Sequence, residues 1–216
     1  MTRAVLSMLI AAACLAAIRS SAQVAVPPAA SRLTTGDKFR MYIRQTYSLP
    51  SVLFPAAFAG LDEATDSPKE WGQGKRGYLD RLGTQRGQFQ IGAFCGFAVG
   101  AAFHEDPRFS PSGRHDRWSR TAYVLTHTLL ARSDGGKVMP AFGNYAAALG
   151  AGFAPAAWLP PSEASIANSL ERSAAMLGMN VGMNMGIEFG PDDRRFFRDK
   201  ILRRFHRRKP ATNQLP

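Results

Sequence analysis

An all-α bundle is the fold class that this sequence predicts, and three observations predict it. No run of alternating apolar and polar residues with β-branched enrichment marks a strand. Pro, Gly and capping residues divide the chain into about five to seven helical segments. Glycines repeat every four residues in two of these segments, which predicts helices that pack closely through glycine faces.

The first 22 residues have the pattern of a secretory signal peptide. Arg3 gives a positive start, residues 4–17 are apolar, and small residues end at Ala22. We expect cleavage after Ala22, which leaves residues 23–216, enough for one ordinary domain. The apolar run is too short for a stable transmembrane anchor. Lipoprotein processing at Cys14 stays open as an alternative.

The mature chain divides into four expected parts. They are a disordered Pro/Ala-rich lead-in over 23–34, a helical bundle over 35–190, a basic amphipathic helix over 191–209 and a disordered tail over 210–216. The expected helices cover residues 35–48, 51–64, 67–103, 116–132, 140–154, 162–189 and 192–206. Ser67 is expected to cap the third helix, in a capping box that accounts for Glu70. Gly190 and Pro191 are expected to end the sixth.

The glycine repeats are the strongest internal signal. One run is Gly92, Gly96 and Gly100, and the other is Gly178, Gly182, Gly186 and Gly190. Each glycine costs a helix up to about 1 kcal/mol relative to Ala, so the spacing requires a gain from close backbone approach. Gly143, Ala147 and Ala151 give the segment between the two runs a weaker form of the pattern. We therefore expect these three helices to pack on one another, with self-association through the same faces as a further use, and Gly182→Leu to destabilise strongly.

The uncharged segments do not resemble membrane spans. The longest, residues 138–162, is interrupted by Asn144 and by prolines. Residues 88–103 and 173–187 are shorter than the roughly 20 apolar residues that a span requires. The sequence thus favours a soluble bundle over a membrane-embedded one.

The densest polar cluster is His104, Glu105 and Asp106. If the cluster is catalytic, His115, Asp116 or His127 is expected to join it. Imidazole and carboxylate groups suit a metal-dependent or acid–base hydrolase. The other interpretation is a helix C-terminus, where His104 complements the helix dipole and the carboxylates pair with Arg108. No HExxH, phosphate-loop or nucleophile-elbow motif is present, so the sequence predicts no cofactor and no bound metal.

A polar stripe runs beside the second glycine run. It consists of Asn180, Asn184 and Glu188, which lie four residues apart. These side chains are either buried interhelical hydrogen-bonding groups, with His127 or an arginine as partner, or the solvated side of the helix. The spacing alone does not separate these two interpretations.

The basic character of the chain belongs to its C-terminal end. Residues 23–190 hold 16 Lys/Arg and 13 Asp/Glu, a net of +3, whereas residues 191–216 hold 9 and 3, a net of +6. Phe197, Ile201 and Phe205 recur every four residues among the basic side chains of Arg194, Arg195, Arg198, Arg203, Arg204, Arg207 and Arg208. This pattern is typical of a helix on an anionic membrane surface, or of an apolar stripe docked on the bundle. Export argues against nucleic acid as a partner.

Two motifs carry a resemblance to a known family. They are E-W-G-Q-G-K-R-G-Y, at residues 70–78, and H-E-D-P-R-F, at residues 104–109. In these motifs, and across most of the mature chain, the sequence resembles an uncharacterised family of exported bacterial proteins. The resemblance implies export and a shared fold, and it brings no activity and no catalytic residue.

The sequence therefore leads to one expected function and one alternative. We expect a non-catalytic structural or interaction protein of the cell envelope, in the periplasm or at a membrane face. The alternative is a hydrolase built on His104, Glu105 and Asp106. Whether the chain is an enzyme stays open at this point.

Overall fold

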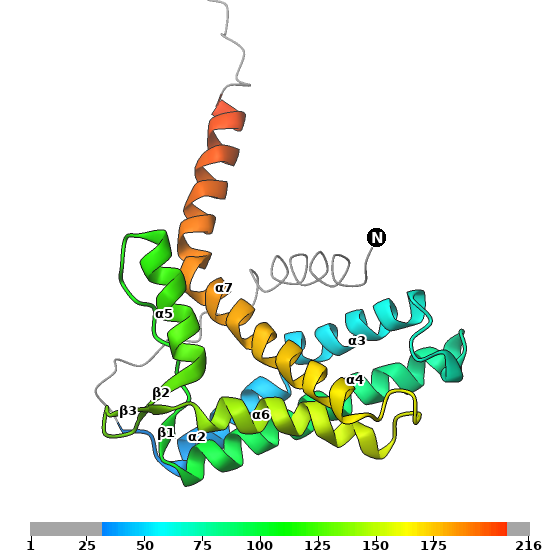
Figure 1. The fold of residues 1–216 in the computed structure, drawn as a ribbon. Coiled ribbons are helices and arrows are strands. Elements are labelled where there is room, and N and C mark those ends of the chain that lie inside the picture. The colour runs from blue at the N-terminus through cyan, green and yellow to red at the C-terminus, as the bar shows by residue number, and fades with distance from the viewer. Residues whose placement is uncertain (1–31, 207–216) are drawn as a thin grey trace, which may run out of the picture.

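The structure is a computed structural model that describes residues 32–206, with side chains described as far as Asp192. These residues form six α-helices, which confirms the predicted all-α class (Figure 1). The helices are α2 (Thr35–Thr46), α3 (Leu49–Ala64), α4 (Lys75–Ala102), α5 (Arg117–Leu129), α6 (Phe142–Phe153) and α7 (Ile166–His206). The expected signal peptide at residues 1–22, Cys14 and the tail at residues 210–216 lie outside the described residues.

Helix α4 has the most helical neighbours: α2, α3 and α6 all pack against it. Helix α6 also packs against α7, and so connects α4 to α7. Helix α5 stands apart from this group, and its main helical partner is α7. Figure 1 shows α5 beside the middle of α7, where α7 bends and its C-terminal part leaves the rest of the molecule.

The start of α4 differs from the prediction. We expected a helix from Ser67, but residues Lys69–Trp71 form only a short 3-10 helix and α4 begins at Lys75. The reason is backbone conformation: Gly72 has a φ of 62° and Gly74 a φ of 100°. These left-handed angles suit glycine and interrupt a right-handed helix. The predicted capping box at Ser67 is therefore wrong.

Close backbone contact joins α4 to α6 along the first glycine run. A Cβ atom added to Gly92 would lie 2.8 Å from both the Ala147 carbonyl oxygen and the Ala151 Cβ. At Gly96 it would lie 3.0 Å from the Ala147 Cβ and 3.2 Å from the Gly143 carbonyl oxygen. The two helix backbones thus come close enough that larger residues at these positions would have to displace them.

The second glycine run makes no such close contact with another helix. The prediction that α7 packs through these glycines is therefore wrong for the described residues. Nothing lies within 4 Å of the Cβ position of Gly178, Gly182 or Gly190, and Gly186 is exposed. Helix α7 instead approaches α6 through its serines, because Ser169 and Ser173 lie against Gly152. The expectation that Gly182→Leu destabilises by overpacking therefore has no structural basis.

Helix α7 is also longer than predicted. It runs without a break from Ile166 to His206 and includes Gly190 and Pro191, which we expected to end it. A proline inside a helix lacks the N–H of one backbone hydrogen bond, and it kinks the helix more readily than it ends it when tertiary contacts hold both sides. The predicted separate helix over 192–206 is thus the final part of α7, and α7 changes direction along its length (Figure 1).

A small antiparallel sheet was not predicted. Its strands are β1 (Glu105–Asp106), β2 (Leu130–Ser133) and β3 (Val138–Pro140), in the order β1-β2-β3. Strands of two to four residues are too short to show an alternating pattern, so no sequence signal marks them. The turn between β2 and β3 contains Asp134, Gly135 and Gly136, and Gly136 has a φ of 81°.

The apolar core is made of small side chains: Ala59, Val124, Ala141, Ala148 and Ala151. Small residues bury little apolar area each, so close helix contact and buried hydrogen bonds contribute a large share of the stability. Several large apolar side chains stay on the surface, with Trp118 79% exposed and Ile166 73% exposed. Among the described residues, no helix combines the length and the hydropathy that crossing a bilayer requires.

Candidate functional site

The residues of the candidate catalytic cluster point in different directions. His104 follows the end of α4 with a φ of 54°, and its side chain is 80% exposed. Its Nδ1 lies 3.8 Å from the nearer carboxylate oxygen of Asp134. Glu105 is only 6% exposed and turns inward, where its carboxylate accepts a hydrogen bond from the Gly143 backbone N–H at 2.9 Å.

Glu105 acts as a cap that reaches α6 from another part of the chain. Gly143 is in the first turn of α6, and no side-chain hydrogen bond from the N-cap residue Ala141 satisfies that turn. Burial raises the pKa of Glu105 above its ordinary value, and the hydrogen bond from Gly143 and the charge of Lys38 oppose this shift. The position of this carboxylate is explained by helix capping.

Asp106 pairs with Arg108, as the structural interpretation of this cluster expected. The guanidinium Nε donates to the Asp106 carboxylate at 2.8 Å, and a terminal nitrogen donates at 2.5 Å. Burial opposes ionisation of Asp106, but the hydrogen bonds from Arg108 outweigh it, so the pKa of this carboxyl lies below its ordinary value.

Lys38 connects this region to α2, and sequence reasoning missed it. Its side chain is 4% exposed, and its ammonium group donates to the Asp134 carboxylate at 2.7 Å. A lone lysine on an amphipathic helix is normally solvated, and 96 positions separate it from its partner. The H-E-D-P-R motif and the β2–β3 turn therefore form one ionic cluster that holds α2, β1 and α6 together.

His127 does not join the cluster, so that part of the catalytic prediction is wrong. It lies on α5 with its ring centroid 4.1 Å from that of Tyr123 and 6.0 Å from that of Phe109. Burial, and then the charge of Arg132, lower the pKa of this imidazole. In the described part of the chain, no three His, Cys, Asp or Glu side chains are placed to hold a metal ion together.

The E-W-G-Q-G motif surrounds a buried arginine. Arg81 is 1% exposed, and it donates to the Glu63 carboxylate at 2.5 Å and to the Gly72 carbonyl at 2.7 Å. Further hydrogen bonds from this guanidinium reach the carbonyls of Ser67 and Pro68. The connection between α3 and α4 therefore wraps its backbone around Arg81, and Gly72 is the motif residue that takes part.

Glu70 is not part of a capping box in this structure. Its carboxylate accepts a hydrogen bond from the Ser162 hydroxyl at 2.5 Å, and this bond lowers the pKa of Glu70. Ser162 precedes α7, so the contact joins the α3–α4 connection to the start of α7. The role of Glu70 is structural, as predicted, but its partner is different.

The polar stripe of α7 faces other helices: Asn184 and Glu188 are buried and Asn180 is half-buried, so its side chains are interhelical hydrogen-bonding groups and not the solvated side of the helix. Asn180 donates to the Asn144 side chain at 3.0 Å, and Asn144 donates to the Thr128 carbonyl at 2.9 Å. Asn184 donates to Asn180 at 3.1 Å. This chain of amides joins α5, α6 and α7 at one point.

Glu188, the last member of the stripe, is 2% exposed and binds the N-terminal side of α5. Its carboxylate accepts from the Ser112 N–H at 2.8 Å and from Arg120 Nε at 2.9 Å, so its partner is an arginine and not His127. Burial opposes ionisation, but the hydrogen bonds from Ser112 and Arg120 outweigh it and hold the pKa of Glu188 below its ordinary value. Arg120 also pairs with Asp192 and lies 4.2 Å from the Phe189 ring centroid.

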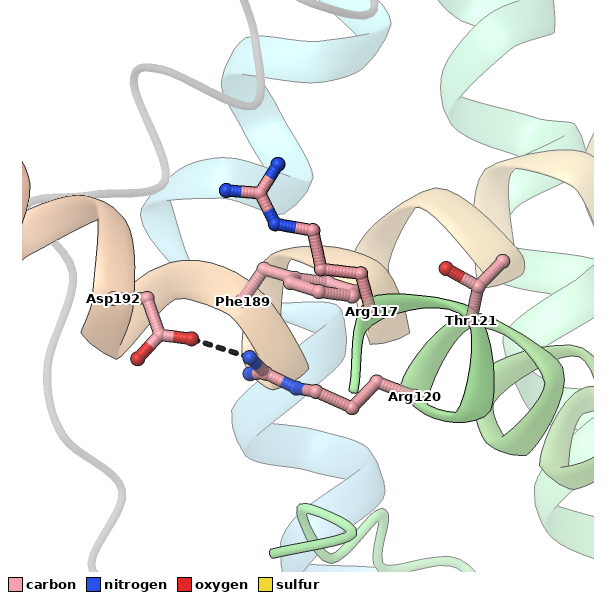
Figure 2. A pocket seen from close by; sticks show the side chains of 5 residues that line it. All are labelled: Arg117, Arg120, Thr121, Phe189 and Asp192. Atoms are coloured by element: carbon pink, nitrogen blue, oxygen red, sulfur yellow. Dashed lines mark hydrogen bonds and ion pairs between the residues drawn. The ribbon is translucent and has the colours of Figure 1, made fainter. Parts of the chain in front are cut away.

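An open hollow of about 350 Å³ lies between α5 and α7 at this junction. Figure 2 shows its lining: Arg117, Arg120 and Thr121 from α5, and Phe189 and Asp192 from α7. The dashed line in the figure is the ion pair between Arg120 and Asp192. The hollow contains no nucleophile beside a base, so it does not resemble a hydrolytic centre.

The predicted membrane-contacting residues follow directly after this junction. The backbone of α7 is helical as far as His206, so it carries Arg194 to Phe205 on a continuation of the same helix. Arg207 and Arg208, and the side chains beyond Asp192, lie outside what the structure describes. The junction of α5 and α7 is thus the described base of the basic segment.

Comparison with known proteins yields no match to a family model, a curated protein or a solved structure.

Proposed function

We propose that this chain is an exported, non-catalytic protein of the bacterial cell envelope that attaches to an anionic membrane surface through the basic end of α7. The observation that carries the proposal is the junction of α5 and α7. There Arg120 pairs with both Glu188 and Asp192 immediately before the basic segment begins.

The junction gives the basic segment a fixed base. In this ion pair the side chain of Arg120 is 12% exposed and the side chain of Glu188 is 1% exposed. Ser112 adds two hydrogen bonds to the same carboxylate. An ion pair shielded from solvent with these extra bonds holds its geometry better than a surface pair. From Asp192 to His206 the helix extends about 20 Å further, at 1.5 Å for each residue.

The charge of this extension suits an anionic surface. Residues 194–209 hold nine Lys/Arg and one acid, Asp199, whereas residues 23–190 have a net charge of only +3. Each basic residue near an anionic bilayer contributes about 1 kcal/mol, so half of them engaged would give several kcal/mol. That is enough for reversible attachment when apolar side chains also insert.

The hydrolase alternative has less support. His104 faces solvent, Glu105 caps α6, Asp106 pairs with Arg108, and His127 lies on another helix. General acid–base catalysis requires such groups to face one reacting position. These four side chains do not face one another, and Glu105 and Asp106 are held by structural partners.

Deletion of the residues after Asp192 tests the proposal. A chain that ends after Asp192 keeps the pairs of Arg120 with Glu188 and Asp192, so we expect it to fold with unchanged circular dichroism apart from the lost helix. It should lose most of its binding to vesicles that contain phosphatidylglycerol. Undiminished binding by this truncated chain would overturn the proposal.

Export is tested separately. Mass spectrometry of the protein from its native envelope should find Gln23 at or near the N-terminus. A cytoplasmic protein that retains Met1 would contradict the proposed location.

A further inference from the structure

The outer face of α5 is apolar, exposed and bordered by arginines. Its exposed residues include Trp118 at 79%, Leu125 at 46% and Leu129 at 49%, with Ala122 between them. At 100° for each residue, these four side chains fall within about 60° of arc on one side of the helix. We call them the Trp118 stripe.

The opposite face of α5 accounts for the attachment of this helix to the fold. Val124 and Thr128 are fully buried, and Arg120 binds Glu188 on α7. The helix is therefore amphipathic in an unusual sense: its inner face carries the polar network, and its outer face carries the tryptophan and the leucines. An exposed stripe of this composition is typical of a surface that meets a partner.

The charge around the Trp118 stripe identifies the kind of partner. Helix α5 contains no acid, and Asp116 is the single acid among residues 107–133. Of the five arginines in that range, Arg108 and Arg120 are largely buried in ion pairs, so they add no free charge to this surface. Arg114 and Arg117 are exposed at the end of the helix that carries Trp118. Tryptophan beside arginine, with leucines on the same face, is the composition of a helix that lies in the headgroup region of an anionic bilayer.

The position of α5 agrees with this partner. Helix α5 packs beside the middle of α7, and Figure 1 shows the two helices meeting where α7 bends and leaves the bundle. The exposed Arg117 also lines the hollow shown in Figure 2, next to Phe189. The Trp118 end of the stripe therefore lies near the base of the basic segment, on the side of α5 that faces away from α7.

We propose that α5 is a second membrane contact, which lies in the interface of an anionic bilayer with the Trp118 stripe inserted among the headgroups. This inference rests on the proposed function and adds to it: the basic end of α7 supplies charge, and α5 supplies apolar insertion. Two separate contacts also fix the orientation of the bundle on the membrane, which one helix alone does not.

The first test is binding by a variant of the stripe. Leu125→Gln/Leu129→Gln, in the chain without residues 1–22, should bind phosphatidylglycerol vesicles on the order of tenfold more weakly, because two apolar side chains no longer insert. Ile166→Gln/Leu170→Gln is the matched control, because those two residues, at the N-terminal end of α7, are more exposed than the two leucines of the stripe. Its binding should equal that of the unchanged protein.

The second test is the environment of Trp118 itself. In a Trp71→Phe/Trp158→Phe background, checked for folding by circular dichroism, Trp118 emission should shift to the blue on vesicles and be quenched by brominated lipid. Unquenched emission together with full binding by the α5 variant would overturn the inference and leave the role of α7 intact.

The two proposals fail in different ways. If the chain cut after Asp192 still binds and Trp118 is quenched, α5 is the contact and the proposed role of α7 is wrong. If vesicles leave Trp118 unchanged while a second protein protects it, the stripe is a protein-binding face and the inference about lipid is overturned.

Discussion

Two glycine-to-alanine changes, at Gly92 and at Gly182, test how the bundle is held together. Both residues lie inside helices, so both substitutions gain the same helix propensity, about 1 kcal/mol. At Gly182 nothing lies within 4 Å of the new methyl group, so the gain is the whole effect and the variant should be more stable. At Gly92 the methyl group would lie 2.8 Å from the Ala147 carbonyl oxygen, a backbone atom that moves only with α6.

The magnitude follows from the comparison of the two variants. Overpacking a close contact costs about 1–3 kcal/mol, and the propensity gain cancels between the two variants. Gly92→Ala should therefore be about 1–3 kcal/mol less stable than Gly182→Ala. Urea unfolding followed by circular dichroism measures both values, with the slope of the transition checked for each variant. Equal stabilities for the two variants would refute the close contact between α4 and α6.

Three further predictions concern the buried polar groups and the tail. Arg81→Met should lower the free energy of unfolding by about 3–5 kcal/mol, because it leaves Glu63 without its buried partner, whereas Arg76→Met on the exposed side of α4 should change little. The pKa of Glu188 is lowered in the fold, so the ionised carboxylate stabilises the folded state. This contribution to stability is fully present above pH 4.5, the ordinary pKa of a glutamate, and is lost as the pH falls below it. In Glu188→Gln the acid-side loss of stability should thus be shallower, with Glu171→Gln as the exposed control on α7, and identical pH profiles would contradict the assignment. Asn180→Leu should lower the melting temperature, since it leaves the Asn144 side-chain oxygen without its donor, and an unchanged value would remove the amide chain from the account.

The sequence predicted those features that depend on neighbours along one helix. The expected helix over 116–132 is found as α5, and Asp116 caps it, with its carboxylate accepting from the Ser119 N–H at 2.7 Å. The glycine spacing correctly placed Gly92 and Gly96 on one face. The same spacing failed for Gly178 and Gly182, because periodicity shows which residues share a face and not whether a neighbour lies against it.

The polar contacts between distant elements could not be predicted in the same way. Lys38 and Asp134 lie 96 positions apart, and Arg120 and Glu188 lie 68 apart. A single Lys or Arg on an amphipathic helix has the composition of a solvated face, so nothing local marks it as buried. Gly72 and Gly74, whose left-handed conformations place the start of α4 after them, also could not be recognised from the sequence, since glycines occur throughout this chain.

The central claim, attachment to an anionic membrane surface, is tested most directly by vesicle binding of the chain without residues 1–22. The account predicts binding to phosphatidylglycerol vesicles and none to phosphatidylcholine vesicles. It also predicts a steep loss of binding as salt approaches about 0.5 M, where the Debye length is about 4 Å. Equal binding to both kinds of vesicle, or no binding to either at low salt, would contradict it.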